Sequence, residues 1–231
     1  MILNVGTGEP KTGVFERAIA VGETNPRVYT SLGVHPHDAR FYDDETEAKI
    51  KSLLSSGART IAWGEIGLDF HYDNSPRDVQ TAVFARQLQA AKDSKLPVII
   101  HTREAETESI AILKAEYSDA TRRGIFHCFS GSAELAKQAI QLGFMISFSG
   151  IVSFKTAHEL RSIAKSVPAE RLLIETDCPF LTPVPHRGKR NEPAYVIEVA
   201  RCLAEVRNTS IEEIAEVTTN NFLRFFELSS N

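Results

Sequence analysis

Cysteine is scarce in this chain, and long hydrophobic runs are absent. The three cysteines, Cys128, Cys178 and Cys202, are odd in number and show no paired spacing, which is typical of free thiols in a reducing compartment. No apolar run approaches the roughly 20 residues that a transmembrane helix needs. Residues 1–10 also lack the basic start and apolar stretch of a signal peptide. These absences predict a cytoplasmic protein.

An excess of positive charge is also lacking. The net charge is -4, so the molecule as a whole does not attract polyanions, and any contact with nucleic acid must depend on a local basic patch. One such patch is the segment His186–Arg190, which contains Arg187. A solvated surface loop is one interpretation of this segment, and a phosphate-binding loop is the other.

The chain has the length and pattern of one α/β domain. Its 231 residues suit a single barrel, a fold of about 250 residues, better than two small domains. Short apolar segments without strict alternation are separated by segments of helical periodicity, as expected for parallel strands covered on both faces. We therefore expect an α/β fold, a TIM (β/α) barrel, with residues 1–231 forming one domain.

The predicted elements can be read along the sequence. The strands are Ile2–Gly6, Val28–Val34, Thr60–Glu65, Pro97–His101, Gly124–His127, Phe144–Phe148 and Leu172–Asp177. The helices are Asp43–Ser56, Pro76–Ser94, Glu104–Ser118, Ala133–Leu142, Thr156–Val167 and a C-terminal segment through Ile211 and Phe222. Two helix starts carry capping-box patterns, Ser75-Pro76 with Asp78 and Ser210 with Glu213.

Four predicted strands end on a residue that can bind a divalent metal ion: Glu65, His101, His127 and Asp177. The carboxyl ends of parallel barrel strands converge on one face, so these side chains should meet in one pocket. Oxygen and imidazole donors without an obligatory thiolate favour a catalytic over a structural site, for Mg²⁺, Mn²⁺ or Zn²⁺. Clustered carboxylates would also repel one another unless a cation or proton intervened.

Longer motifs surround these residues. In chain order they are "ILNVGTG", "GVHPHDA", "GEIGLDFHY", "PVIIHTREA", "FHCFSG", "ISFSGIVSFK", "LLIETDCPFLTPVPHRGKRNEPAYV" and "TTNNFLRFF". Together they resemble the TatD-related metal-dependent deoxyribonucleases of the amidohydrolase superfamily, from Ile2 to Phe226. The resemblance implies a TIM-barrel metal hydrolase with one or two divalent ions per chain. It also implies cleavage of phosphodiester bonds in DNA, often from the 3' end of a single strand.

The resemblance assigns roles to the four candidate ligands. Glu65 matches the family's bridging carboxylate, His101 and His127 match the imidazole ligands of one metal, and Asp177 matches the carboxylate at the other. A His-x-His pair on the family's first strand would fall before Met1. Seven βα units are therefore recognisable, with the first family strand missing. The resulting open barrel edge is a place where self-association would cover unpaired backbone.

Residues near the candidate ligands have more than one interpretation. His35 and His37 share the spacing of the missing pair, but the family carries this "VHPH" motif in addition to that pair, so we expect a substrate-side role. A structural role beneath the substrate loop and replacement of the missing ligands are the alternatives. Arg103 could grip a substrate phosphate or form a surface ion pair. Asp69 and His71 could be loop residues or active-site residues. Glu175 faces the same side as Asp177 and is expected to orient a ligand. We expect Cys128 and Cys178 to be buried thiols.

A mechanism follows from these assignments as an expectation. Asp177 would orient or deprotonate the attacking water, Glu65 would hold the metal ions, and the basic side chains would neutralise substrate phosphates. The substrate would be DNA, at single-stranded ends. Two alternatives stay open. One is a hydrolase of amide or aminoacyl-ester bonds, and the other is a truncated barrel with weakened or no catalysis.

Overall fold

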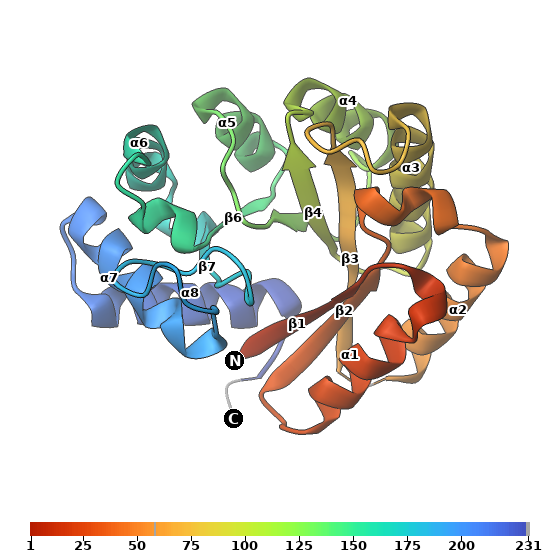
Figure 1. Cartoon of the computed structure of the whole chain (residues 1–231), viewed down its shortest axis with the longest axis horizontal. Helices are drawn as coiled ribbons and strands as arrows, with labels where there is room; N and C mark the ends of the chain where they lie inside the picture. Colours follow the sequence, from red (N-terminus) through yellow and green to blue (C-terminus); the bar gives the residue numbers. More distant parts are fainter. Residues whose placement is uncertain (58, 230–231) are drawn as a thin grey trace. The chain divides into compact units, whose positions relative to one another are not determined.

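The computed structural model describes residues 1–57 and 59–229, which belong to two compact units, Met1–Ile125 and Phe126–Asn231. In each unit, strands alternate with helices along the chain (Figure 1). No helix among the described residues is both long and apolar enough to cross a membrane.

The first unit contains four parallel strands that pair in chain order. They are β1 (Ile2–Thr7), β2 (Val28–Gly33), β3 (Thr60–Asp69) and β4 (Val98–Arg103). The helices between and after them are α1 (Val14–Glu23), α2 (Asp44–Ser56), α3 (Arg77–Asp93) and α4 (Glu106–Glu116). Because the order in space follows the chain and crossovers are right-handed, successive helices lie on the same face of the sheet, as Figure 1 shows for α1, α2 and α3.

Buried hydrogen bonds fix helix α3 against this sheet. The side chain of Gln87 accepts from the backbone N–H of Val34 at 2.9 Å and from the indole N–H of Trp63 at 3.3 Å. Its amide also donates to the carbonyl oxygen of Val34. Since Trp63 and Gln87 are almost completely buried, these bonds satisfy polar groups that water cannot reach. They hold the chain in place immediately before His35.

Strands β3 and β4 leave no room for a side chain at one position near their carboxyl ends. A bulge interrupts their register at Glu65, so that Gly64 pairs with Ile99 and Ile66 with Ile100. A bulge redirects the side chain of the extra residue, in this case Glu65. At Gly67, with φ +145°, an added Cβ would lie 1.9 Å from the carbonyl oxygen of His101. This position therefore requires glycine.

The second unit contains strands β6 (Met145–Phe148) and β7 (Leu172–Ile174), which pair in parallel. Strand β5 (Gly124–Phe126) crosses from the first unit into the second. The helices are α5 (Ala133–Gln141), α6 (His158–Ser166), α7 (Val196–Arg207) and α8 (Ile211–Phe226). Asn221 of α8 donates to the carbonyl oxygens of Ala169 and Leu172, which fixes α8 against β7.

Short 3-10 helices complete the described chain. They are η1 (Pro10–Thr12), η2 (Pro36–Phe41), η3 (Gly150–Ser153), η4 (Ala169–Arg171) and η5 (Pro193–Tyr195). The second of them, η2, carries His37 and follows directly on His35. Its backbone is tied to the segment before α3, since Ser75 donates to the carbonyl oxygen of His37 and accepts from the N–H of Arg40.

The α/β class with seven strands is confirmed, whereas several boundaries were predicted wrongly. Strand β3 continues beyond Glu65 to Asp69, and β7 ends at Ile174, before Asp177. Helices α1 and α7 were not predicted. The cap at Ser210 is confirmed, since its hydroxyl accepts from the N–H of Glu213. The cap at Ser75 is wrong, because its hydroxyl is engaged with η2 and α3 begins without a side-chain cap.

Replacement of Gly67 by alanine tests the close approach of β3 to β4. We expect Gly67→Ala to lower the free energy of unfolding by about 3–5 kcal/mol, since backbone strain and overpacking add. Gly8→Ala is the control, because Gly8 has a similar φ of +133° and its added Cβ would meet nothing closer than 3.9 Å. The control should lose only about 1–2 kcal/mol in denaturant unfolding. Equal losses would contradict the close approach.

Candidate metal centre

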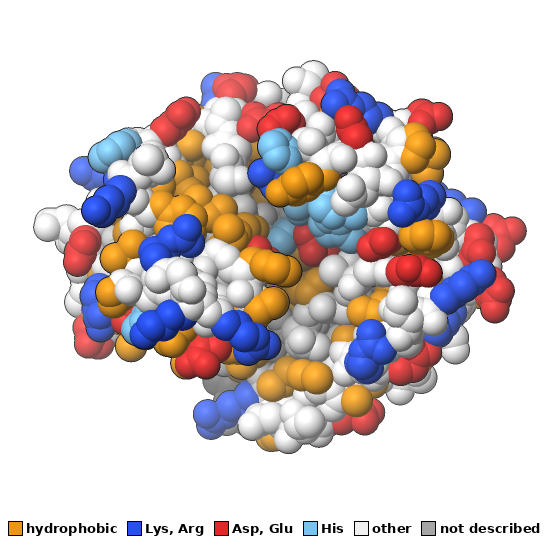
Figure 2. All heavy atoms as spheres, in the orientation of Figure 1, with side chains coloured by type: hydrophobic (Ala, Val, Ile, Leu, Met, Phe, Trp, Pro, Cys, Tyr) orange, Lys and Arg blue, Asp and Glu red, His pale blue; other side chains and the backbone are white. Residues whose placement is uncertain are grey.

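The first unit brings together three side chains from three neighbouring segments. His35 follows β2, Glu65 lies on the bulge of β3, and His101 lies on β4. One donor atom from each lies within 4.8 Å of the others. His101 Nδ1 is 3.0 Å from Glu65 Oε1, and His35 Nε2 is 3.5 Å from the same oxygen. On the viewed face, histidine side chains gather beside acidic ones (Figure 2).

The imidazole of His101 lies between two carboxylates. Its Nδ1 faces Glu65, and its Nε2 is 2.9 Å from Asp69 Oδ2. Asp69 stands four residues after Glu65 on the same strand, and alternate residues of a strand point to the same side. Contact with one carboxylate on each ring nitrogen fixes the plane of the ring. Of the two interpretations of Asp69, the one that makes it a loop residue is wrong, since it lies on β3 and is only 1% exposed.

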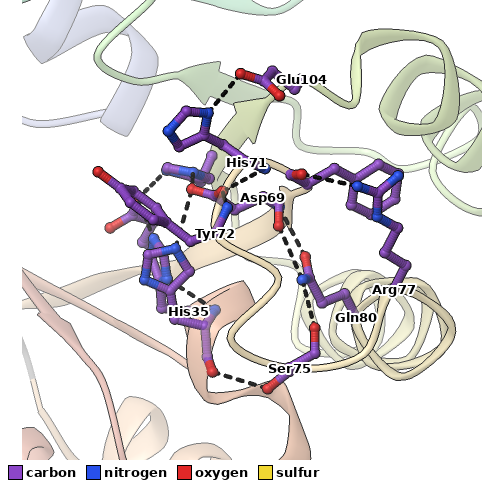
Figure 3. Close-up of polar contacts among 12 residues, drawn as sticks. His35, Asp69, His71, Tyr72, Ser75, Arg77, Gln80 and Glu104 are labelled. Atoms are coloured by element: carbon purple, nitrogen blue, oxygen red, sulfur yellow. Dashed lines mark hydrogen bonds and ion pairs between the residues drawn. The ribbon is translucent and has the colours of Figure 1, made fainter.

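Asp69 has hydrogen-bond partners on both carboxylate oxygens (Figure 3). Oδ1 accepts from the backbone N–H groups of His71 and Tyr72, at 3.1 and 3.2 Å, while Oδ2 faces His101. Gln80 binds the backbone N–H and carbonyl of Asp69. Burial alone would raise the pKa of Asp69, but the hydrogen bonds from His101 and Tyr72 outweigh it and hold this pKa far below the usual range. Asp69 is therefore ionised at neutral pH.

His35 and His37, which lie beside Glu65 and Asp69, differ from His101 in their hydrogen bonding. His35 Nδ1 accepts from the backbone N–H of His37 at 3.1 Å, so this nitrogen carries no proton. In the neutral ring the proton is then on Nε2, the nitrogen that faces Glu65, which suits a hydrogen-bond donor better than a metal ligand. Burial, with help from nearby His35, lowers the pKa of His37. His37 Nε2 lies 3.1 Å from Asp69 Oδ2, without the alignment of a hydrogen bond.

The donor atoms of Glu65 and His101 fit a divalent metal ion. With metal–donor bonds of about 2.0–2.2 Å, two ligands on one ion stand about 3 Å apart, and His101 Nδ1 and Glu65 Oε1 are separated by 3.0 Å. Asp69 on the opposite nitrogen completes the carboxylate–histidine arrangement that commonly orients a metal ligand. Nitrogen and oxygen donors suit Zn²⁺ and Mn²⁺, and the carboxylate also suits Mg²⁺.

The second unit holds another group of three potential ligands, His127, Glu175 and Asp177, again with donor atoms within 4.8 Å of one another. His127 follows β5, while Glu175 and Asp177 follow β7. His127 Nδ1 is 3.3 Å from Glu175 Oε1. Glu175 extends the pairing of β7 with β6, since its N–H donates to the carbonyl oxygen of Phe148. Asp177 adopts a left-handed conformation, with φ 56°.

The basic segment His186–Arg190 is anchored in the second unit. The Arg187 guanidinium lies 3.9 Å from the centre of the Phe154 ring and donates to the carbonyl oxygen of Thr182. His186 stacks on Tyr195 with ring centres 4.1 Å apart. Arg187 and Arg190 remain exposed, so their charges face solvent from a fixed loop.

Other residues singled out in the sequence lie as follows. Arg103 ends β4 and places its guanidinium over the Tyr72 ring, 4.8 Å from its centre. His71 is paired with Glu104 at 2.6 Å. Cys178 is exposed and Cys128 is partly exposed, so the prediction of buried thiols is wrong. Their strands end before these residues, and strand alternation therefore does not apply to them.

Within each unit the structure brings predicted residues together, Glu65 with His101 and His127 with Asp177. It adds Asp69, whose place was missed because β3 was expected to end at Glu65. A local signal was the two-residue spacing of Glu65, Gly67 and Asp69, but a glycine weakens a strand pattern. Glu175 contacts His127 Nδ1, as an orienting carboxylate would.

Comparison with known proteins places the chain in a family. The family model described as TatD related DNase matches residues 2–227. The uncharacterized metal-dependent hydrolase YabD of Bacillus subtilis is 46% identical over 99% of this chain and 88% of its own length. The 3'-5' ssDNA/RNA exonuclease TatD of a Rahnella strain is 35% identical over 87% of this chain and 78% of its own length.

A solved structure agrees with this result. The crystal structure of YjjV, a TatD homologue from Escherichia coli, is 30% identical to this chain, with a TM-score of 0.89. The match covers 97% of this chain and 86% of YjjV. The chain therefore belongs to the TatD-related DNase family of metal-dependent hydrolases.

Proposed function

We propose that this protein is a divalent-metal-dependent deoxyribonuclease that removes nucleotides from the 3' end of single-stranded DNA. The observation that carries the proposal is the position of His101 between Glu65 and Asp69, which leaves one imidazole nitrogen and one carboxylate oxygen 3.0 Å apart. The name of the Rahnella relative, an exonuclease for single-stranded DNA and RNA, supports the choice of substrate.

In this proposal four residues hold the metal ions: Glu65, His101, His127 and Asp177. A divalent ion, Mg²⁺, Mn²⁺ or Zn²⁺, would polarise a phosphoryl oxygen and lower the pKa of water toward neutrality when bound. Asp69 and Glu175 orient the two imidazoles through the ring nitrogens that they contact. Asp177 orients the attacking water and accepts its proton.

In this proposal, arginine side chains and the two histidines His35 and His37 hold the substrate phosphates. Arg187 presents a guanidinium from the anchored loop of the second unit, and Arg103 presents one from the end of β4. A guanidinium can bind a phosphate through two parallel hydrogen bonds. His35 lies beside Glu65, with its Nε2 3.5 Å from Glu65 Oε1, and would contact a substrate phosphate from this position. His37 contributes next to it from η2.

Neutralising a proposed ligand tests this assignment. We expect Glu65→Gln to remove bound metal and abolish cleavage, and Asp177→Asn to lower kcat by about 10²–10⁴-fold, the usual contribution of a positioned general base. Metal content by mass spectrometry and release of nucleotides from a single-stranded oligonucleotide measure the two effects. Circular dichroism confirms folding. Unchanged cleavage by both variants would reject the assignment.

Replacement of Asp69 tests its positioning role. Asp69→Asn replaces one carboxylate oxygen with an amide NH₂ group. A single oxygen then remains to accept from His101 and from the backbone N–H groups of His71 and Tyr72, so the His101 ring loses its fixed orientation. We expect Mn²⁺ affinity and cleavage to fall by about 10–100-fold, with partial recovery of cleavage at saturating Mn²⁺.

The matched control is Asp73→Asn, because Asp73 is exposed and its carboxylate pairs only with Arg77 among the contacts of the described residues. The control should bind Mn²⁺ as the unchanged protein does. A loss of stability in Asp69→Asn without a change in Mn²⁺ affinity would show that Asp69 supports the fold and not the metal site.

A panel of substrates separates this function from its alternatives. Hydrolysis of cyclic amides or aminoacyl esters, without cleavage of DNA, would favour the other hydrolase. Bound metal without turnover of any substrate would favour a barrel that lacks catalysis. Cleavage of RNA at the same rate as DNA would widen the substrate to both nucleic acids.

A further inference from the structure

Tyr72 is an exposed aromatic side chain next to the first group of ligands. It is 55% exposed, more than any other large hydrophobic side chain of the first unit among the described residues. Its ring lies 5.5 Å from the ring of His37, which in turn lies 4.3 Å from the ring of His35. The ring faces water beside the candidate ligands, so a flat partner that stacks on it would remove apolar surface from water.

The ring of Tyr72 is held in place on several sides. The Arg103 guanidinium lies 4.8 Å from its centre, and the His37 and His71 rings meet it nearly perpendicularly, at 87° and 88°. His71 is in turn paired with Glu104. Contact with a cation and two rings restricts the motion of Tyr72 although it faces solvent. Little conformational entropy would be lost when a flat ligand stacks on it.

Asp69 connects this ring to the metal ligands. One oxygen of its carboxylate accepts from the backbone N–H of Tyr72 (Figure 3), and the other faces His101 Nε2. The turn that carries Tyr72 is therefore fixed by the same buried group that orients His101. A ligand stacked on Tyr72 would have a defined position relative to Glu65 and His101.

We propose that Tyr72 and Arg103 form a platform for one unpaired nucleotide of the substrate strand, next to the phosphate that is cut. The aromatic ring stacks on the base, and the guanidinium, held over the ring, binds the phosphate of the same nucleotide. This inference rests on the proposed nuclease function and adds the reason for a preference for single strands. A base within a duplex is stacked and paired, so it cannot also lie on Tyr72.

A cycle of two changes tests the platform, one in the protein and one in the substrate. The substrates are a single-stranded oligonucleotide and the same strand with an abasic nucleotide at the end that is cut. Tyr72→Ala should raise KM for the intact strand by about 5- to 150-fold, the range of aromatic stacking on one base, with little change in kcat. The abasic strand should show a similar rise in KM with the unchanged protein and little further rise with Tyr72→Ala.

Two further variants control for indirect effects. Tyr72→Phe, which keeps the ring, should recover most of the affinity for the intact strand. Phe41→Ala removes another exposed aromatic ring of the first unit that carries an arginine guanidinium, 4.9 Å from its centre, and should leave KM unchanged.

Each outcome bears on one claim. An unchanged KM in Tyr72→Ala, or rises in KM that multiply when both changes are combined, would overturn the platform and leave the nuclease intact. Failure of the unchanged protein to cleave any nucleic acid would overturn the proposed function itself.

Discussion

The buried carboxylate of Asp69 lies where strand β3, the turn at His71 and Tyr72, and the candidate ligand His101 meet. An ionised carboxylate with 1% exposure is stable only when its oxygens are satisfied, and removal of one partner from a buried charged pair costs about 3–5 kcal/mol. Here the satisfying groups are His101 and the N–H groups of His71 and Tyr72. Because the buried charge of Asp69 needs these hydrogen bonds, it fixes the His101 imidazole and the turn at His71 and Tyr72 together.

The backbone of β3 provides the geometry for this arrangement. The bulge at Glu65 turns its carboxylate toward His101. Gly67, which has no side chain, lets β3 approach β4 where Gly67 pairs with His101. Glu65 and Asp69 then contact opposite nitrogens of one ring. One carboxylate is thus available to share a cation with His101, and the other is committed to orienting the ring.

The sequence predicted which candidate ligands lie close together better than it predicted their surroundings. Glu65, His101, His127 and Asp177 follow from motifs and from polar residues after apolar segments, which are local features. Asp69 was misplaced because Gly67 and the acidic Glu65 suggest the end of a strand, whereas pairing with β4 continues to Asp69. Pairing across strands is a tertiary effect that local propensity does not contain.

Capping and exposure show the same limit. The Ser210 cap depends only on Glu213, three residues away, and was predicted correctly. The hydroxyl of Ser75 bonds instead to His37, far away in sequence. The exposure of Cys178 could not be foreseen either, because it depends on β7 ending at Ile174. Features that depend on near neighbours in the chain could therefore be predicted from the sequence, and features that depend on distant segments could not.

The most direct test of this account is the anomalous scattering of Mn²⁺ in a crystal of the protein. The account predicts a peak within coordination distance of Glu65 and of His101 Nδ1, while His101 Nε2 keeps its hydrogen bond to Asp69. A crystal soaked in Mn²⁺ with no peak there, or with the ion on Nε2 and Asp69 displaced, would contradict it.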